Sequence, residues 1–145
     1  MAKTVSITKV VHVPAARIFD ALTDPAQHAL IDGSGSVRGT FRESATRLKL
    51  GDTFGMDMRL GAPYRVTNRV VEYEEGRLIA WRHFAGHRWR WELKPVDEQS
   101  TEVTETFDYS TAPMPLLMHL LGFPQRNRRG IQATLDRLET VLAAG

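Results

Sequence analysis

Three polar side chains are predicted to share one strand face with large aromatic residues. Asn68, Arg82 and Glu105 follow the same alternation as Trp89 and Trp91 in the central part of the chain. Ordinary cores exclude such charges, because an unpaired buried ion is very costly. A face that mixes aromatic rings with a few polar groups is instead typical of a cavity lining.

Arg82 and Glu105 are the residues of this set that could take part in chemistry, because their side chains can carry charge. They could anchor the polar end of a ligand, one of them could act as an acid or base with a shifted pKa, or they could form a structural ion pair. Burial would raise the pKa of Glu105 if no cation compensated for it. Asn68 and Tyr109 could donate or accept neutral hydrogen bonds with a ligand, or could satisfy the two charged residues.

The remaining site candidates are apolar and would form either the cavity wall or plain core. Methionine suits a flexible pocket because its side chain adapts easily. The full predicted ligand-binding set is Phe54, Met56, Met58, Asn68, Arg82, Trp89, Trp91, Glu105, Phe107 and Tyr109. No catalytic constellation is recognised among them.

Neither metal chemistry nor phosphate chemistry is indicated. The chain has no cysteine, which excludes disulfides, thiolate catalysis and Cys-ligated zinc. His83 and His87 are four residues apart, but on the predicted hairpin they point to opposite faces. The run from Gly33 to Gly39 has the wrong glycine spacing for a phosphate loop. It is predicted to be a mobile loop at the cavity mouth that Asp32 caps or gates, and no cofactor or metal is expected.

The hydrophobic pattern predicts a strand, two short helices, a series of antiparallel strands and a long C-terminal helix. Strands are expected at 4–13, 37–41, 47–50, 53–59, 64–73, 77–84, 87–94 and 101–109, and short helices at 15–23 and 26–31. The last helix follows Pro124, where apolar residues recur at helical spacing: Ile131, Leu135, Leu138 and Leu142.

Register decides which residues face the cavity, because a slip of one residue reverses both faces. A tight hairpin at Ala85-Gly86 pairs Arg82 with Trp89. The inner face of this hairpin is then Leu78, Ala80, Arg82, Phe84, Trp89, Trp91 and Leu93. The opposite, solvated face is Trp81, His83, Arg88, Arg90, Glu92 and Lys94.

The neighbouring strands complete the predicted inner face. Closing the loop before Arg77 puts Asn68 directly beside Arg82. An apolar match across the following loop puts Glu105 beside Trp91, with Phe107 and Tyr109 on the same side.

Composition limits the classes of protein. At 145 residues, with 42% hydrophobic and 25% charged residues, the chain is expected to form one domain over residues 1–145. The formal charge of +2 is too weak to indicate a nucleic-acid partner. No run approaches the roughly 20 apolar residues of a membrane span, and no secretory signal is recognised, so a cytoplasmic protein without an integral membrane segment is expected.

The stretch from Met114 to Phe123 is apolar nearly all round. Such a segment is expected to be buried under the last helix, to form a homodimer contact, or to cover the cavity entrance, and the covering role is favoured. Arg126, Arg128 and Arg129 follow it as a basic cluster, which a solvated helix face explains more simply than nucleic acid does.

Four segments resemble the START-like superfamily known as SRPBCC, particularly its polyketide cyclase/dehydrase-like branch. They are 11–25 (VHVPAARIFDALTDP), 48–54 (LKLGDTF), 76–82 (GRLIAWR) and the closing helix 131–142. The resemblance implies an α+β helix-grip fold, in which a curved antiparallel sheet wraps around a long C-terminal helix. Members hold lipids, sterols, polyketides, quinones or plant hormones between sheet and helix, and only some are enzymes. They share no catalytic set that could be transferred to this sequence.

Three functions follow as hypotheses. The leading one is a protein that binds a hydrophobic or amphipathic small molecule, such as a lipid, sterol or polyketide. The second is an enzyme of the aromatase/cyclase or dehydratase kind, which directs proton transfers on a bound polyketide-like substrate. The third is an interaction module similar to the cochaperone members of the superfamily. An open cavity lined by Asn68, Arg82 and Glu105 would favour the first two over the third.

Overall fold

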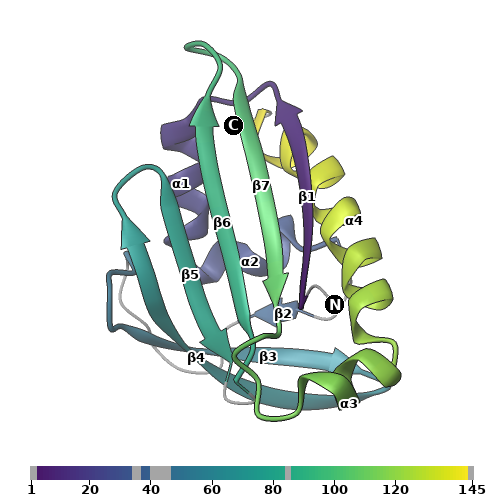
Figure 1. The fold of residues 1–145 in the computed structure, drawn as a ribbon. Helices are drawn as coiled ribbons and strands as arrows, with labels where there is room; N and C mark the ends of the chain where they lie inside the picture. The colour runs from purple at the N-terminus through teal and green to yellow at the C-terminus, as the bar shows by residue number, and fades with distance from the viewer. Residues whose placement is uncertain (1–2, 34–36, 40–46, 84–85, 144–145) are drawn as a thin grey trace.

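The computed structural model describes residues 3–33, 37–39, 47–83 and 86–143, which form a curved sheet with helices against one face (Figure 1). The elements in chain order are β1 (Thr4–Val11), α1 (Ala15–Leu22), the short helix η1 (Pro25–Gln27), α2 (His28–Ile31), β2 (Val37–Gly39), β3 (Thr53–Leu60), β4 (Ala62–Glu74), β5 (Leu78–His83), β6 (Arg88–Pro95), β7 (Thr101–Asp108), α3 (Pro115–Leu120) and α4 (Phe123–Ala143).

Within these described ranges, seven strands form one antiparallel sheet in the order β1-β7-β6-β5-β4-β3-β2. The first strand of the chain therefore pairs with the last one. In Figure 1, α1 and α2 lie behind the sheet, and α4 runs beside them on the same face. The predicted helix-grip arrangement is confirmed.

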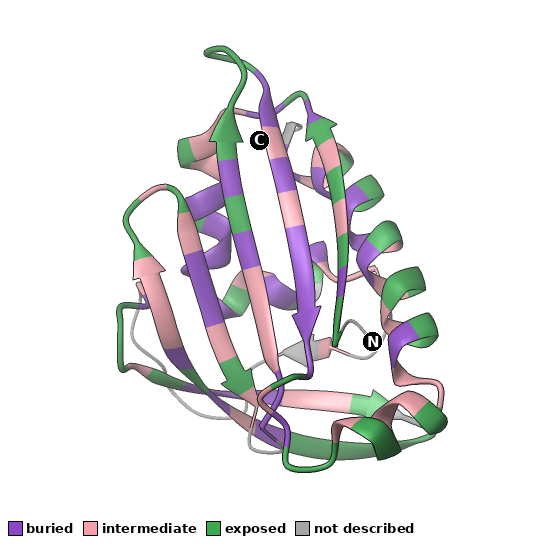
Figure 2. Cartoon of the chain, viewed as in Figure 1, coloured by how far each residue is buried: buried purple, intermediate pink, exposed green. Residues whose placement is uncertain are grey.

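The core lies between the sheet and the helices. The stripe predicted for the last helix is buried, as Figure 2 shows for the sheet-facing side of α4: Ile131, Leu135, Leu138 and Leu142. Helix α1 begins directly after Pro14, whose fixed φ suits a helix start, and it buries Ile18, Phe19 and Leu22. Because each helix has only one apolar stripe, both are oriented by the sheet that covers that stripe.

Two predicted strands differ from the structure. Residues 47–50 form an irregular segment instead of a strand; the Leu48 N–H donates to the Thr23 carbonyl at 2.8 Å, which ties the segment to the end of α1. The strand expected at 37–41 appears as β2 over Val37–Gly39, and its last two positions lie outside the described residues. No helix in the described ranges is both long enough and apolar enough to cross a lipid bilayer.

The β5–β6 hairpin closes one residue earlier than predicted. The His83 N–H donates to the His87 carbonyl at 2.9 Å, and Trp81, not Arg82, pairs with Trp89. The predicted pairing is therefore wrong, and the two faces of β5 are exchanged.

Three residues predicted for the inner face lie on the outer face instead: Leu78, Ala80 and Arg82. The inner positions of β5 belong to Ile79, Trp81 and His83. The corresponding prediction for Phe84 lies outside the described residues.

Strand β4 has a register irregularity between Val70 and Glu72. Before this irregularity in the chain, Asn68 pairs with His83. The predicted position of Asn68 beside Arg82 is therefore also wrong. The extra residue in β4 keeps Asn68 and Val70 buried on the inner face although their partners on β5 differ from those predicted.

Candidate functional site

A cavity of about 680 Å³ lies between the sheet and the first half of α4. Its wall includes side chains from α2, from strands β2 to β7, from α3 and from α4. Seven of the ten predicted site residues line it: Phe54, Met56, Met58, Asn68, Trp89, Trp91 and Glu105. Their ligand-binding role stays a prediction, but the structure brings them to one place.

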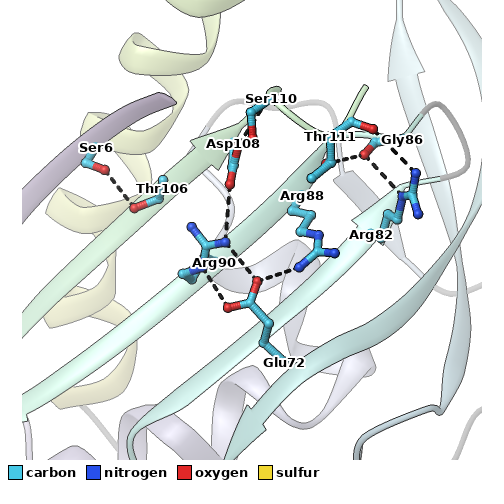
Figure 3. Close-up of polar contacts among 10 residues, drawn as sticks. All are labelled: Ser6, Glu72, Arg82, Gly86, Arg88, Arg90, Thr106, Asp108, Ser110 and Thr111. Carbon is cyan, nitrogen blue, oxygen red and sulfur yellow. Dashed lines mark hydrogen bonds and ion pairs between the residues drawn. The ribbon is translucent and has the colours of Figure 1, made fainter. Parts of the chain in front are cut away.

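The other three predicted residues lie elsewhere. Phe107 and Tyr109 are buried behind the wall, where the Phe107 ring packs 5.0 Å from that of Trp89 and 5.4 Å from that of Tyr109. Arg82 is exposed on the outer face, and its guanidinium donates to the carbonyls of Gly86 and Thr111 at 3.2 and 3.4 Å (Figure 3). Arg82 therefore cannot reach the cavity or pair with Glu105.

The cavity contains polar groups that have no partner in the described structure. Among the described residues, Asn68 Oδ1, His87 Nδ1 and Glu105 Oε1 are buried without a hydrogen bond. All three residues line the cavity. Leaving a buried polar atom unpaired typically costs about 1–3 kcal/mol, so native proteins rarely retain several of them without a purpose.

Among the described residues, no cation pairs with the Glu105 carboxyl. Burial raises the pKa of Glu105 well above its usual value, and the charge of Asp32 raises it further. Glu105 is therefore a neutral carboxylic acid at mildly acidic pH, in which state it can donate one hydrogen bond and accept others.

His83 and His87 form a stacked pair in the cavity wall. Their rings lie 4.4 Å apart at an interplanar angle of 15°, so the prediction that they point to opposite faces is wrong. Burial lowers the pKa of His83 to about 4; burial and the neighbouring His83 lower that of His87 to about 3. Both imidazoles are therefore neutral near pH 7, when each has one nitrogen that accepts and one that donates.

A second aromatic group connects α2 to the sheet. The His28 ring stacks on Trp81 at 4.9 Å, and the Phe54 ring meets the His28 ring edge-on at 5.4 Å. His28 Nε2 lies 2.8 Å from the Leu22 carbonyl, which can only accept, so this nitrogen carries the hydrogen. Burial lowers the pKa of His28, which keeps the ring neutral.

Sequence reasoning missed these contributors to the wall. His28 is not in the predicted site set, and Trp81 and His83 are predicted on the solvated face, yet all three line the cavity. The signal that could have placed the last two is Gly86, whose φ of 101° matches the left-handed final position of a three-residue hairpin loop. With this loop closed between His83 and His87, all three tryptophans of the chain line the cavity.

A close contact with α4 shapes one side of the mouth. The Gly33 N–H donates to Thr134 Oγ1 at 2.9 Å, and a Cβ at Gly33 would lie 2.3 Å from the Ala133 carbonyl carbon. Only glycine fits here. Asp32, which also lines the cavity, accepts from the Val37 N–H at 3.3 Å. Residues 34–36 of the predicted mouth loop lie outside the described part.

Helix α3 forms another side of the mouth. Met118 and the nearby Phe123 line the cavity, whereas most of the helix remains exposed, so the alternative of burial under α4 is wrong. Tyr109 Oη lies 3.5 Å from His119 Nδ1 and links α3 to the end of β7. The covering role favoured for this segment stays a prediction.

A second, more open hollow lies on the β3–β4 hairpin, beside Tyr64 and Arg65. We take the cavity under α4 as the site because it contains the buried polar groups and the aromatic wall. Among the described residues, no three His, Asp or Glu side chains are grouped so that they could hold a metal ion.

The sequence matches one family over most of its length. Residues 2–143 match the family described as polyketide cyclase / dehydrase and lipid transport. The chain belongs to this family. Its membership agrees with the helix-grip architecture and confirms the resemblance to the START-like superfamily.

The chain has a relative of similar sequence in Mycobacterium tuberculosis. The chain is 41% identical over 140 residues to the uncharacterized protein Rv0088 of Mycobacterium tuberculosis; the match covers 93% of this chain and 62% of that protein. The chain thus spans somewhat less than two thirds of the length of that relative.

Solved structures share the fold at low identity. Protein Ms6760 from Mycobacterium smegmatis superimposes with a TM-score of 0.73 at 17% identity, over 99% of this chain and 92% of that one. The AHSA1-like protein from Aeromonas hydrophila gives a TM-score of 0.71 at 21% identity, over 97% and 92% of the two chains. These similarities establish the helix-grip fold. They do not identify a ligand, which has to be inferred from the residues of the site.

Proposed function

We propose that this chain binds a hydrophobic or amphipathic small molecule in the cavity under α4. The observation that carries the proposal is the set of three unpaired polar atoms, on Asn68, His87 and Glu105, within a wall that also contains many aromatic and aliphatic side chains. A ligand with hydroxyl or carbonyl groups supplies the missing partners and buries its apolar skeleton against the rings. The volume of about 680 Å³ suits a molecule of lipid, sterol or polyketide size.

The charges around the cavity suggest how such a molecule is oriented. The buried His87 imidazole is neutral near pH 7, and burial shifts the Glu105 carboxyl towards its neutral form. The cationic lining residues, Arg126 and Arg129, are exposed on α4. Neutral oxygens of the ligand are therefore expected at the deep end, and any anionic group is expected at the mouth.

A matched pair of probes tests this proposal. Fluorenone and fluorene share one ring skeleton, and only fluorenone has a carbonyl oxygen. Quenching of the three cavity tryptophans measures binding of either compound. We expect fluorenone to bind about fivefold more tightly than fluorene, as one additional hydrogen bond provides. Glu105→Leu should abolish this preference because it removes the donor, whereas Glu105→Gln should retain it.

Arg82→Ala is the matched control, because Arg82 lies on the outer face. It should leave both affinities within about twofold of the wild type. The proposal would be contradicted if neither probe binds the wild type. It would also be contradicted if Arg82→Ala and Glu105→Leu lose the preference for fluorenone to the same extent. If the probes bind as expected, native mass spectrometry of protein purified from its own host would identify the natural ligand.

An enzymatic function is the second candidate, and Glu105 is the observation that favours it. A neutral carboxylic acid in an aromatic cavity is a suitable general acid for cyclisation or loss of water in a polycarbonyl substrate. The family description includes cyclase and dehydrase members. If this candidate is correct, Glu105→Gln should still bind a linear tetraketide but should no longer accelerate its loss of water.

A further inference from the structure

Helix α3 and the turns beside it expose an unusual amount of apolar surface. Figure 2 shows α3 largely exposed, without a covering element on its outer side. The exposed apolar residues of this segment are Met114, Leu116, Leu117, Leu120 and Leu121, with Leu120 at 72% exposure. They are half of the large hydrophobic residues that the described structure exposes, so the apolar surface is concentrated here.

The segment that carries this apolar surface is also basic. No Asp or Glu occurs between Asp108 and Asp136. In that interval, Arg126, Arg128 and Arg129 are exposed on the first turns of α4. None of the three forms an ion pair with another described residue.

The same segment borders the cavity mouth. Met118, Phe123, Arg126 and Arg129 line the cavity, while Leu120 and its exposed neighbours point away from it. The Arg126 guanidinium lies 4.4 Å from the centre of the Phe123 ring, so charge and apolar surface meet directly at the mouth. Anything that covers the outer side of α3 therefore lies next to the opening.

We propose that α3 and the first turns of α4 dock on the surface of an anionic lipid bilayer. The apolar side chains would enter the headgroup region, and the three arginines would contact lipid phosphates. This inference rests on the proposed ligand binding, because docking would let a hydrophobic ligand pass between bilayer and cavity without crossing water. We call the residues Met114, Leu116, Leu117, Leu120, Leu121, Arg126, Arg128 and Arg129 the docking face.

Charge favours a bilayer over a second copy of the chain. A symmetric dimer through the docking face would bring two clusters of arginines together, with no acidic residue from this segment to neutralise them. Anionic phospholipids supply the opposite charge over a wide area and accept the leucines as well. The docking face therefore complements a lipid surface better than it complements itself.

Co-sedimentation of the whole chain with vesicles tests the proposal. We expect binding to vesicles of equal parts phosphatidylglycerol and phosphatidylcholine, weaker binding in high salt, and little binding to pure phosphatidylcholine. Arg128→Gln should weaken binding about fivefold, and Leu120→Asp about tenfold or more. Neither residue lines the cavity, so fluorenone affinity should be unchanged in both variants.

Two variants serve as matched controls at the opposite end of the sheet from α3. Lys94→Gln removes one exposed positive charge at the end of β6, and Val96→Asp places an acid at an exposed apolar position after it. Both should bind vesicles like the wild type. Equal losses in the controls and in the docking-face variants would overturn the proposal, because they would show a general charge effect.

The remaining outcomes separate docking from the other proposals. Absence of vesicle binding by a wild type that still binds fluorenone would refute docking alone. Vesicle binding without fluorenone binding would refute the cavity proposal and leave docking to lipid intact. If light scattering instead shows a dimer that Leu120→Asp dissociates, the docking face is a contact between copies and the bilayer proposal is wrong.

Discussion

At the scale of single residues, the environment of Glu105 is the most informative feature. A buried carboxylate is tolerated when a cation pairs with it, but the nearest predicted cation, Arg82, lies on the opposite face of the sheet. Burial instead raises the pKa of the carboxyl well above its usual value, and the charge of Asp32 acts in the same direction. In its protonated form Glu105 is a hydrogen-bond donor in a cavity whose other buried polar residues include Asn68 and His87.

The raised pKa of Glu105 predicts an unusual pH dependence of stability. Above the usual value of 4.5, the unfolded state releases this proton while the folded state keeps it, so folding becomes less favourable as the pH rises. The penalty grows by up to about 1.4 kcal/mol for each pH unit until the folded pKa is reached. Glu105→Gln should therefore gain stability relative to the wild type between pH 5 and pH 8.

Urea unfolding at several pH values measures this difference, and Glu98→Gln, in the exposed loop after β6, is the control. A difference between Glu105→Gln and the wild type that stays constant with pH would show that Glu105 titrates normally. The stacked histidines act in the opposite sense: their lowered pKa values destabilise the fold as the pH falls below about 6.5.

At the scale of elements, one row of residues crosses the outer face of five strands. Glu72, Ala80, Arg90, Thr106 and Ser6 are neighbours in register from β4 to β1. Arg90 reaches across the small side chain of Ala80 and makes two hydrogen bonds to Glu72, at 3.0 and 2.8 Å (Figure 3). The pKa of Glu72 is lowered chiefly by Arg90, as expected for an ion pair. This row holds the register that places Trp81 and His83 inside.

Ala80→Leu should interrupt that row. Ala80 is fully buried between Glu72 and Arg90, so a larger side chain would separate the ion pair. We expect a loss of about 1–3 kcal/mol in the free energy of unfolding, measured in urea. In a Glu72→Gln background the same substitution should cost less, because part of the interaction is already gone. Equal costs in both backgrounds would place the effect in packing alone.

At the scale of the whole molecule, the fold keeps a cavity of about 680 Å³ between the sheet and α4. The sheet is curved, and its β3–β4 end lies below α4 and beside α3 in Figure 1. The cavity lies between this sheet and α4, and Gly33 and the α3 residue Met118 are part of its lining. An empty apolar cavity lowers stability in proportion to its size, because the wall loses dispersion contacts. A ligand that fills the cavity should therefore raise the melting temperature by mass action.

Val66→Phe tests whether this volume is open. Val66 is buried on β4 and lines the cavity, so a larger ring there would occupy the space of a ligand. We expect fluorene and fluorenone to bind about tenfold more weakly or worse, with a melting temperature equal to or above that of the unliganded wild type. A variant that unfolds far below the wild type would show that the space is already packed.

The spacing of apolar residues along the sequence was enough to predict most helices and strands. It was also enough to predict which residues of β6 and β7 face the helices. Alternation placed Trp89, Trp91 and Glu105 inside because β6 and β7 pair without irregularity over their whole length. Helical spacing likewise predicted the buried stripe of α4. Period and chain order are properties of short segments, so sequence alone can reveal them.

Only the tertiary structure decided which charges and rings meet in the cavity. One residue in the closure of the β5–β6 hairpin exchanged Arg82 for Trp81 and His83, and one extra residue in β4 kept Asn68 inside. His28 reached the same wall from α2, although it lies 53 residues before Trp81, the β5 residue that it contacts. Alternation is the same in either register, so the choice between them depends on packing between distant segments that the local sequence does not contain.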